Sequence, residues 1–509
     1  MTELFSNFHG RDFPDYSEDS FNSMLVESGR IIQTGYDLQK KSEFSGLPRN
    51  DLKGKFLFPA FCDAHTHFLQ TGLTELGTDL SSCRSISDMS EMLSEAAKKN
   101  SSDWILAWNL DETTFKEKRF PTLTELNKAV SDKHLWISRV DLHSALVNNK
   151  ALKWAQEKIS DLQTDISADT LRIWKQSFLQ LSGMLISSLG KDFILHALEK
   201  SRKKCIENGV TFVHALEGGA GINFDVVEIV ADFLESDRFS GTIYHQSTNP
   251  ELVLKRHWNK IGGCLMVDGS FGSRSAALNE PYTDDPSNSG EIYLSSEIIE
   301  NLLEMCSEKN LQLSLHCIGD RAIKHLLSIH SKARNKLASP ALPHRIEHFE
   351  MPDSQSLDIA AECGLYICVQ PAFETLWGGK GKMYEKRLGP ERTRLTNPFK
   401  SMLKAGLKIA AGSDSPVTTF NPFQGIYGFL NHPTPTERIS LNDALTAYIL
   451  HPHHFYGNKT DRGMLKAGYK ADFNLFQEDI FLISTNELMT TKPYQTFISG
   501  KYATIGDML

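Results

Sequence analysis

The middle of the chain alternates short apolar runs with amphipathic stretches that have helical spacing. The stretch Glu297–Lys309, for example, places Ile298, Leu302, Leu303 and Cys306 on one face, as in a helix that covers a sheet. The apolar runs are continuous rather than alternating, which is typical of parallel strands covered on both faces. This succession of strand and helix predicts βα units around a parallel sheet.

Eight of the apolar runs are candidate strands of this sheet, and a closed (β/α)₈ barrel requires that number. They are Phe56–Asp63, Leu135–Val140, Val210–His214, Cys264–Val267, Leu311–His316, Arg345–His348, Tyr366–Val369 and Lys408–Ala411. We therefore expect a barrel to occupy most of the chain.

The two ends of the chain have a different pattern. Met24–Gly35 contains two short β-type runs and predicts a hairpin, and Gly463–Phe476 and Pro493–Tyr502 again show short strands with glycine turns. Neither end is long enough for a core of its own, so we expect both ends to share one small β-domain. The predicted division is a composite β-sandwich of residues 1–58 and 452–509 beside a barrel of residues 59–451 that carries insertions.

Composition and charge exclude several classes of protein. Of the 509 residues, 40% are hydrophobic and 10% aromatic, which supplies a large core and excludes disorder as the main state. The net charge of −9 does not suit a nucleic-acid binder. No apolar run reaches the roughly 18 residues needed to span a bilayer, and Met1–Arg11 lacks a signal-peptide core. Eight cysteines without regular spacing favour free thiols in a reducing compartment, so we expect a cytoplasmic protein without nucleic-acid or membrane partners.

The motif Asp63-Ala-His65-Thr-His67 follows directly on an apolar run. Side chains at positions i and i+2 of a strand share a face, so His65 and His67 would point together into the mouth of the barrel. Two imidazoles in this arrangement can bind a borderline metal ion such as Zn²⁺. An isolated pair of this kind is more often two ordinary histidines, so the motif alone does not establish a metal site.

Three other predicted strands end in groups of the same chemistry. His316 and His348 end two of the runs, and Asp414 follows the last one. Catalytic groups of barrels lie at the carboxyl ends of the strands. Three neutral imidazoles and one carboxylate can hold Zn²⁺ or Fe²⁺ and lower the pKa of a bound water towards about 7. The sequence therefore predicts a metal centre at the mouth of the barrel.

Several segments together carry a resemblance to a known family. They are His65–His67, Val267–Leu278, His316–Ala322, Arg345–His348 and Gly412–Val417. In combination they resemble the amidohydrolase superfamily, and more narrowly its amidohydrolase-3 branch, which includes N-substituted formamide deformylases. The resemblance covers nearly the whole chain and implies a distorted (β/α)₈ barrel, of class α/β, with a small β-sandwich built from both termini. It also implies metal ligands at His65, His67, His316, His348 and Asp414.

The chain departs from this family at Cys264. Many members carry at this position a lysine that CO₂ carboxylates and that bridges two metal ions, and a cysteine cannot form a carbamate. Cys264 could ligate a metal as a thiolate or pack as a small apolar residue. One divalent ion is therefore expected rather than two, with Zn favoured and Fe or Mn as alternatives. A second, weaker ion held by His316, His348 and Cys264 stays open.

Catalytic and substrate-binding roles follow from this arrangement. We expect Asp414 to accept a proton from water and deliver it to a leaving amine, and His348 to be a ligand or to polarise the substrate carbonyl. Candidate substrate contacts are Arg274, Asp268, Gln370 and His143. The alternatives are a loop salt bridge between Arg274 and Asp268 and a structural histidine at position 143.

The predicted function is a metal-dependent hydrolase that cleaves an amide-type C–N bond, other than a peptide bond, in a small molecule. One alternative is a deaminase of a heterocycle on the same scaffold. The other is a non-catalytic binding protein of amidohydrolase-like fold. The expected partner is the small-molecule substrate, and a homodimer is the commonest oligomeric expectation.

Overall fold

The computed structural model describes residues 2–100, 102–139, 144–160, 164–167, 170–236, 239–338, 340–457 and 460–503. The chain divides into two units. Unit 1 comprises Met1–His67, Arg202–Glu217 and Ala231–Leu509, and unit 2 comprises Phe68–Ser201 and Gly218–Val230.

An eight-stranded sheet lies at the centre of unit 1, in the order β18-β17-β16-β15-β14-β13-β12-β5. The strands are β5 (Phe61–Thr66), β12 (Val210–Gly218), β13 (Ser240–Gln246), β14 (Lys260–Ile261), β15 (Gln312–Cys317), β16 (Arg345–His348), β17 (Tyr366–Val369) and β18 (Ile409–Ala411). A parallel bridge between Thr66 and Ser415 joins the first strand to the segment after the last one. The sheet is thus a nearly closed, distorted (β/α)₈ barrel, as predicted.

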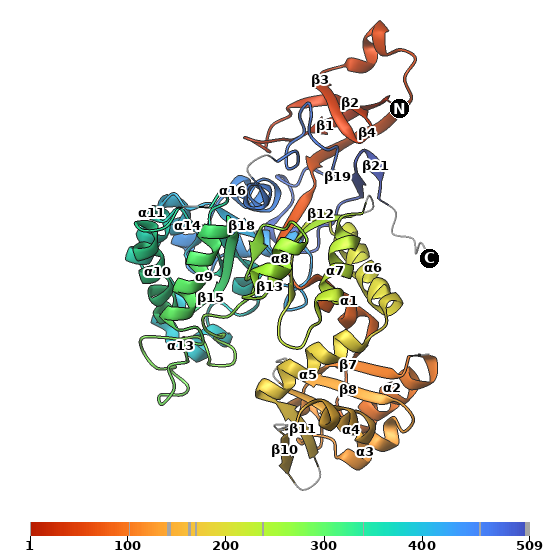
Figure 1. Ribbon diagram of the computed structural model, residues 1–509. Helices are drawn as coiled ribbons and strands as arrows, with labels where there is room; N and C mark the ends of the chain where they lie inside the picture. The colour runs from red at the N-terminus through yellow and green to blue at the C-terminus, as the bar shows by residue number, and fades with distance from the viewer. Residues whose placement is uncertain are drawn as a thin grey trace. The chain divides into compact units, whose positions relative to one another are not determined.

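Helices connect these strands, and α9 and α10 pack against each other and against β15 (Figure 1). Ser295 caps α9 by accepting a hydrogen bond from Ile298 N, and the helix buries Ile299, Leu302, Leu303 and Cys306 while Ile298 itself is exposed. The helices after β5 that lie wholly or partly in unit 1 are α6 (Lys191–Glu207), α7 (Phe224–Leu234), α8 (Pro250–Lys255), α9 (Ser296–Lys309), α10 (Asp320–Arg334), α11 (Ser354–Glu362), α12 (Ala372–Leu376), α13 (Met383–Thr393), α14 (Phe399–Lys404), η4 (Pro435–Glu437), α15 (Pro422–Leu430), α16 (Leu441–Ile449), α17 (His451–Tyr456) and α18 (Thr485–Leu488).

Three of the eight predicted barrel strands need correction. Leu135–Val140 corresponds to β8 (His134–Arg139), which lies in the sheet of unit 2. The fourth barrel position belongs to Lys260–Ile261, and Cys264–Val267 follows it as a loop. The run Phe56–Asp63 is divided between β4 and β5. A continuous apolar run shows that a strand is buried but not which sheet buries it.

The strand β13 (Ser240–Gln246) was missed by the pattern. Its sequence Ser-Gly-Thr-Ile-Tyr-His-Gln contains only two adjacent large apolar residues and begins with a serine and a glycine. Those residue types weaken a strand signal. The contacts of the barrel, rather than local composition, define this strand.

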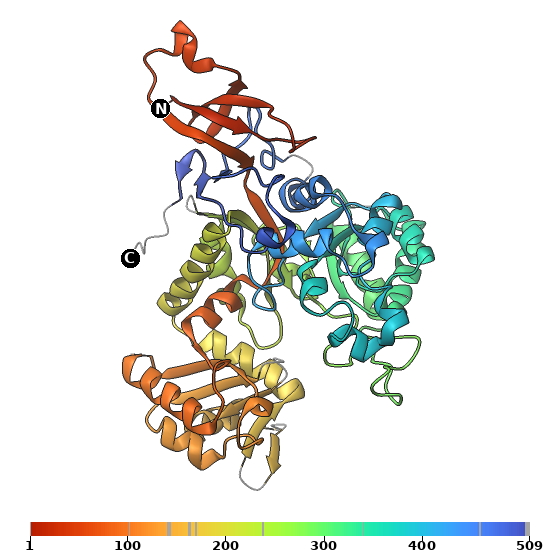
Figure 2. The ribbon, with the colours of Figure 1, turned by 180° about the vertical axis from the view of Figure 1, so that it is seen from behind.

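The two ends of the chain share a seven-stranded sheet in the order β21-β20-β19-β4-β1-β2-β3 (Figure 2). β4 pairs with β1 on one side and with β19 on the other, which unites the ends. Phe5, Phe473 and Phe497 pack in its core, the last two stacked with ring centroids 4.5 Å apart. The elements are β1 (Thr2–Gly10), β2 (Phe21–Glu27), β3 (Arg30–Gly35), η1 (Leu38–Lys40), η2 (Ser42–Phe44), β4 (Arg49–Pro59), β19 (Phe473–Phe476), β20 (Gln495–Ile498) and β21 (Lys501–Tyr502).

Unit 2 has a six-stranded sheet of its own, in the order β10-β11-β9-β8-β7-β6. Its core includes Met89, Leu93, Ile105, Leu126 and Ile137. The elements are α1 (Phe68–Leu76), β6 (Thr78–Asp79), α2 (Ile86–Lys99), β7 (Trp104–Leu110), η3 (Glu112–Thr114), α3 (Leu123–Ala129), β8 (His134–Arg139), β9 (Ser144–Val147), α4 (Asn149–Lys158), β10 (Thr164–Ser167), β11 (Thr170–Trp174) and α5 (Lys175–Ser188). Throughout the described segments of both units, every helix is too short or too polar to cross a membrane.

Candidate metal centre

The strand β5 delivers His65 and His67 to the carboxyl end of the barrel. His65 O accepts a hydrogen bond from Asp414 N at 2.8 Å, and His67 N donates to Ser415 O at 2.9 Å. Oδ1 of Asp63 accepts from the backbone N–H groups of His65 and Ser413 at 3.1 and 3.0 Å. The first residue of the histidine motif therefore fastens the motif to the segment that carries Asp414.

Three ligand-type atoms converge at this point. Nε2 of His65 lies 3.2 Å from Oδ1 of Asp414, and Nε2 of His67 lies 3.3 Å from the same oxygen. This oxygen is buried and has no hydrogen-bond partner. In a tetrahedral zinc site with bonds of about 2.0–2.2 Å, neighbouring ligand atoms are about 3.3–3.5 Å apart. The spacing of the three atoms therefore suits a shared divalent cation.

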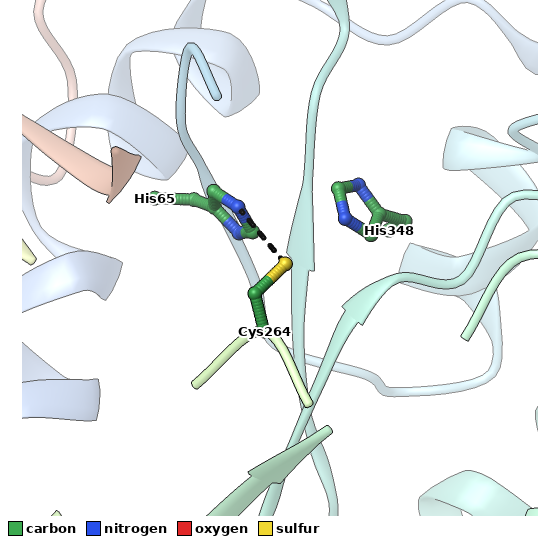
Figure 3. Close-up of side chains that lie close together, drawn as sticks. All are labelled: His65, Cys264 and His348. Atoms are coloured by element: carbon green, nitrogen blue, oxygen red, sulfur yellow. Dashed lines mark hydrogen bonds between the residues drawn. The ribbon is translucent and has the colours of Figure 1, made fainter. Parts of the chain in front are cut away.

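His348 and Cys264 adjoin this group from the other side. The rings of His65 and His348 have centroids 4.9 Å apart, and Sγ of Cys264 lies 4.0 Å from Nε2 of His65. Figure 3 shows the sulfur between the two imidazoles. The ligand atoms of His65, Cys264 and His348 all lie within 4.8 Å of one another, as do those of His65, His67 and Asp414.

His316 lies beside His348, with ring centroids 4.4 Å apart. Within the described part of the chain, it belongs to neither of these two groups. Its buried Nδ1 has no hydrogen-bond partner and lies 3.8 Å from Oδ1 of Asp268. Burial and the neighbouring His348 lower the pKa of His316 to about 4, so its ring is neutral.

The buried side chains at the centre have opposite charges, and each charge offsets the effect of burial on the pKa values of its neighbours. Burial works against a proton on His67, yet Asp414 and Cys264 raise its pKa to about 10. Burial likewise disfavours the charge of Asp414, but His65 and His67 hold its pKa well below the usual range. Burial favours a neutral thiol at Cys264, but the surrounding imidazoles, that of His348 first, hold its pKa far below normal. A divalent cation can supply the positive charge that these imidazole protons supply, and release them.

A buried ion pair behind the centre orients His65. Oε2 of Glu347 lies 2.6 Å from Nδ1 of His65 and accepts a hydrogen bond from Nη2 of Arg345 at 2.8 Å. The hydroxyl of Ser314 donates to the other carboxylate oxygen. Burial opposes the charge of Glu347, but Arg345 and His65 hold the pKa of Glu347 well below its ordinary value. An acceptor on Nδ1 leaves Nε2 of His65 facing Asp414, as carboxylates behind metal-binding histidines do.

The guanidinium of Arg345 has further contacts with three other residues. Its Nη1 lies 2.8 Å from Nδ1 of His214, its Nη2 donates to Ala64 O, and its guanidinium lies 4.4 Å from the ring centroid of Tyr244. Sequence reasoning missed this network, although Glu347 lies inside a motif that it singled out. Successive side chains of a regular strand point to opposite faces, which argues against adjacent roles for positions 347 and 348. At His348 the backbone has φ 71°, and this left-handed conformation breaks the alternation.

Gln370 contacts the ring of His348. Its Oε1 lies 2.6 Å from Nδ1 of His348, and the side chain is fully buried at the end of β17. The ring of His348, held in this way, lies beside Cys264, and the ligand atoms of the two residues are within 4.8 Å of each other. Gln370, a candidate substrate contact in the sequence, therefore orients a histidine in the structure.

Asp268 is buried beneath the same site. Its two oxygens accept hydrogen bonds from the backbone N–H groups of Ala277, Ile318 and Gly319 at 2.8–2.9 Å. Burial raises the pKa of Asp268 to about 7 despite these bonds. The carboxyl group therefore holds the loop after β14 against the end of β15.

Arg274 does not pair with Asp268, contrary to one expectation. Its Nε and Nη2 donate to Asp284 at 3.1 and 2.9 Å, and Arg387 binds the same carboxylate. The reason is that Asp268 is fully occupied by the backbone, whereas Asp284 lies in the same partly exposed loop region as Arg274. His143 lies outside the described residues.

Comparisons with known proteins identify the family of the chain and proteins of similar fold. A family model described as "Amidohydrolase family" matches residues 50–503. The chain is 24% identical to YtcJ of Bacillus subtilis (strain 168), whose name describes it provisionally as an amidohydrolase, over 95% of this chain and 96% of the relative. It is 20% identical to the N-substituted formamide deformylase of Arthrobacter pascens over 94% of each chain. A crystal structure of an uncharacterized metal-dependent hydrolase from Pyrococcus horikoshii OT3 superposes with a TM-score of 0.80 at 23% identity, covering 96% of this chain and 99% of that one.

Proposed function

Because the chain belongs to the amidohydrolase family, we propose that it is a metal-dependent hydrolase that cleaves an amide-type C–N bond, other than a peptide bond, in a small molecule. The main support is the convergence of the Nε2 atoms of His65 and His67 on the buried Oδ1 of Asp414, which has no hydrogen-bond partner. The choice of bond is supported by the relative named as a formamide deformylase.

The donor set fits a divalent cation. It combines imidazole nitrogens with a carboxylate oxygen, which suits Zn²⁺ and also Fe²⁺ or Mn²⁺. We assign one ion to His65, His67 and Asp414. We propose as a further nitrogen donor the neutral ring of His316, which lies next to His348. A cation bound here supplies Lewis acidity, which lowers the pKa of water and polarises a carbonyl oxygen.

The residues of the chain supply the proton transfers. Asp414 is ionised because neighbouring imidazoles hold its pKa low, so it begins the reaction as a base. It accepts a proton from the attacking water and delivers it to the leaving nitrogen. The ring of His348, oriented by Gln370, is placed to donate a hydrogen bond to the substrate oxygen as negative charge develops on it.

The test combines metal analysis with activity on a panel of small N-acyl and N-formyl amides. Purified protein should contain a stoichiometric divalent metal, lose activity on chelation and regain it when Zn²⁺ is added. Asp414→Asn should lower the turnover rate by about 10²–10⁴-fold, as expected for loss of a general base. Asp232→Asn, which removes an exposed partner of Arg256, should leave it unchanged.

Three results would contradict this function in different ways. Ammonia release from a heterocycle without amide cleavage would identify a deaminase. Ligand binding without metal and without turnover would identify a binding protein. Equal activities of the two aspartate variants would remove Asp414 from the reaction.

A further inference from the structure

We infer that Cys264 is a direct thiolate ligand of the metal centre and that it makes the centre select Zn²⁺ or Co²⁺ over Mg²⁺ and Mn²⁺. The inference rests on the proposed function, because it presupposes a cation beside His65. Thiolates favour zinc and similar borderline ions, whereas Mg²⁺ and Mn²⁺ prefer oxygen donors. The residue therefore bears on which metal the protein uses.

The backbone before Cys264 is shaped to bring it to this position. β14 ends at Ile261, and Gly262 and Gly263 follow with φ 95° and 61°. A Cβ on Gly262 would lie 2.2 Å from Ser314 O of β15, so only glycine allows this close approach. Gly262 N donates to His245 O of β13 at 3.0 Å. The turn is thus fixed between the strands on either side.

The backbone after Cys264 is fixed as well. His316 N donates to Leu265 O at 3.0 Å, and Val267 N donates to His316 O at 2.9 Å. These bonds hold the loop in register with the end of β15. Cys264 is therefore positioned by hydrogen bonds on both sides, and its sulfur occupies a defined place among the histidines.

The surroundings of the sulfur are polar. It lies 4.0 Å from Nε2 of His65, and the ligand atoms of His65, Cys264 and His348 are within 4.8 Å of one another (Figure 3). In a tetrahedral zinc site, sulfur and nitrogen ligands are about 3.6 Å apart, so the sulfur is within a few tenths of an ångström of that spacing from His65, the residue that the two groups share. Packing of a small apolar residue does not explain imidazoles on opposite sides of a thiol.

A second observation in the same space points to a cation. Oδ1 of Asp414, whose residue is only 7% exposed, has no hydrogen-bond partner and faces the nitrogens of His65 and His67. Burying an oxygen without a hydrogen bond is costly unless a neighbouring charge or a ligand satisfies it. One carboxylate and one thiolate together balance the charge of a divalent ion, which favours its burial.

Cys368 provides a matched comparison. It lies near the same histidine, in a group with His65 and Glu347. Its thiol, however, donates to Ala64 O at 3.5 Å, and the Glu347 oxygens are taken up by other partners. Burial raises the pKa of Cys368 to about 11. Proximity to His65 alone therefore does not make a ligand.

The decisive experiment uses the full chain loaded with Co²⁺, with the metal content measured on each sample. A cobalt–thiolate bond gives a sulfur-to-metal charge-transfer band in the near ultraviolet. The wild type should show this band, Cys264→Ala should lose it, and Cys368→Ala should keep it. Cys264→Ala should also bind Zn²⁺ at least about tenfold more weakly, since even residues behind a ligand contribute that much.

A second measurement needs no variant. Cys264 and Cys363 are both partly exposed, so their alkylation by iodoacetamide can be followed by peptide mass spectrometry. One equivalent of Zn²⁺ should slow the alkylation of Cys264 by about tenfold or more and leave that of Cys363 unchanged. Equal rates for Cys264 with and without Zn²⁺ would overturn the inference.

The outcomes separate the inference from the function on which it rests. Bound Co²⁺ without a charge-transfer band, or a band that survives in Cys264→Ala, rejects Cys264 as a ligand and leaves the metal-dependent hydrolase intact. A wild-type protein that binds no Co²⁺ rejects both.

Discussion

A histidine stands at each end of the short strand β16, and the two have opposite environments. His344 directly precedes the strand, and His348 is its last residue. His348 is buried, and His344 is partly buried. The difference between them shows what turns a buried histidine into a candidate ligand.

His344, at the amino end, has the environment of a structural residue. Its Nδ1 accepts a hydrogen bond from Leu313 N at 3.0 Å, and its ring lies 5.7 Å from that of His330 on α10. Burial lowers the pKa of His344 to about 4, and burial with the neighbouring His344 lowers that of His330 to about 3. Two neutral rings therefore pack together here.

His348, at the carboxyl end, is buried next to anionic groups. Burial opposes a proton on its ring, but Cys264 and Asp414 raise the pKa of His348 above the usual value. The carboxyl ends of all parallel strands in a barrel meet at one mouth, so residues from β5, β16 and the segment after β18 can gather there. The same residue type four positions earlier has no such partners.

The largest expected effect concerns the buried ion pair of Arg345 and Glu347 on β16. Arg345→Met should destabilise the protein by about 3–5 kcal/mol, because it leaves the carboxylate of Glu347 buried without its cation. The measurement is the free energy of unfolding in urea. Arg394→Met is the control, because it breaks an exposed ion pair with Glu391, and such pairs contribute little. Equal losses of unfolding free energy in both variants would show that the buried ion pair contributes no more to stability than the exposed one.

The sequence indicated the barrel and the residues at its mouth because both depend on rules that act locally. Continuous apolar runs mark buried strands, and strand direction then assigns His65, His67, His348 and Asp414 to one end. The structure brings these four together. The role of Cys264 was left open by its sequence alone, since a thiol suits both a core and a metal.

The support behind the site could not be derived in this way. Arg345 contacts His214, which is 131 positions away, and no local pattern encodes that pairing. The left-handed backbone at His348 is equally invisible, because histidine does not require it. The assignment of residues 135–140 to the barrel failed for a related reason, since a buried strand has the same pattern in either sheet.

A smaller effect is expected for Glu347, whose carboxylate contacts His65 from behind the metal centre. Glu347→Gln should weaken Zn²⁺ binding by about 10–100-fold, because a neutral amide can still accept from His65 but no longer makes its imidazole a stronger donor to the cation. Binding is measured by competition with a chelator. The matched control is Glu350→Gln, another buried carboxyl group close to His348, which accepts a hydrogen bond from Tyr384 at 2.6 Å. If both variants bind Zn²⁺ equally weakly, loss of buried charge in general, and not the contact with His65, explains the effect.

The effect that is smallest near neutral pH belongs to the structural pair, because it appears only in acid. An unfolded His330 takes up a proton below its ordinary pKa of 6.5, whereas the folded residue stays neutral down to about 3. Its contribution to stability is therefore complete above pH 6.5 and is lost as the pH falls towards 3, by up to about 1.4 kcal/mol per pH unit.

His330→Leu removes this titration from the structural pair. Between pH 5.5 and 4, the stability of this variant should fall less steeply than that of the wild type, by up to that same slope, in urea unfolding at a series of pH values. Ile329→Leu alters packing on the same helix without a titratable group, so its curve should run parallel to the wild type. Parallel curves for His330→Leu as well would mean that the buried ring takes up its proton in the folded state. The contrast between the two ends of β16 would then rest on geometry alone, because the neutral state of the structural histidines would no longer distinguish them from His348.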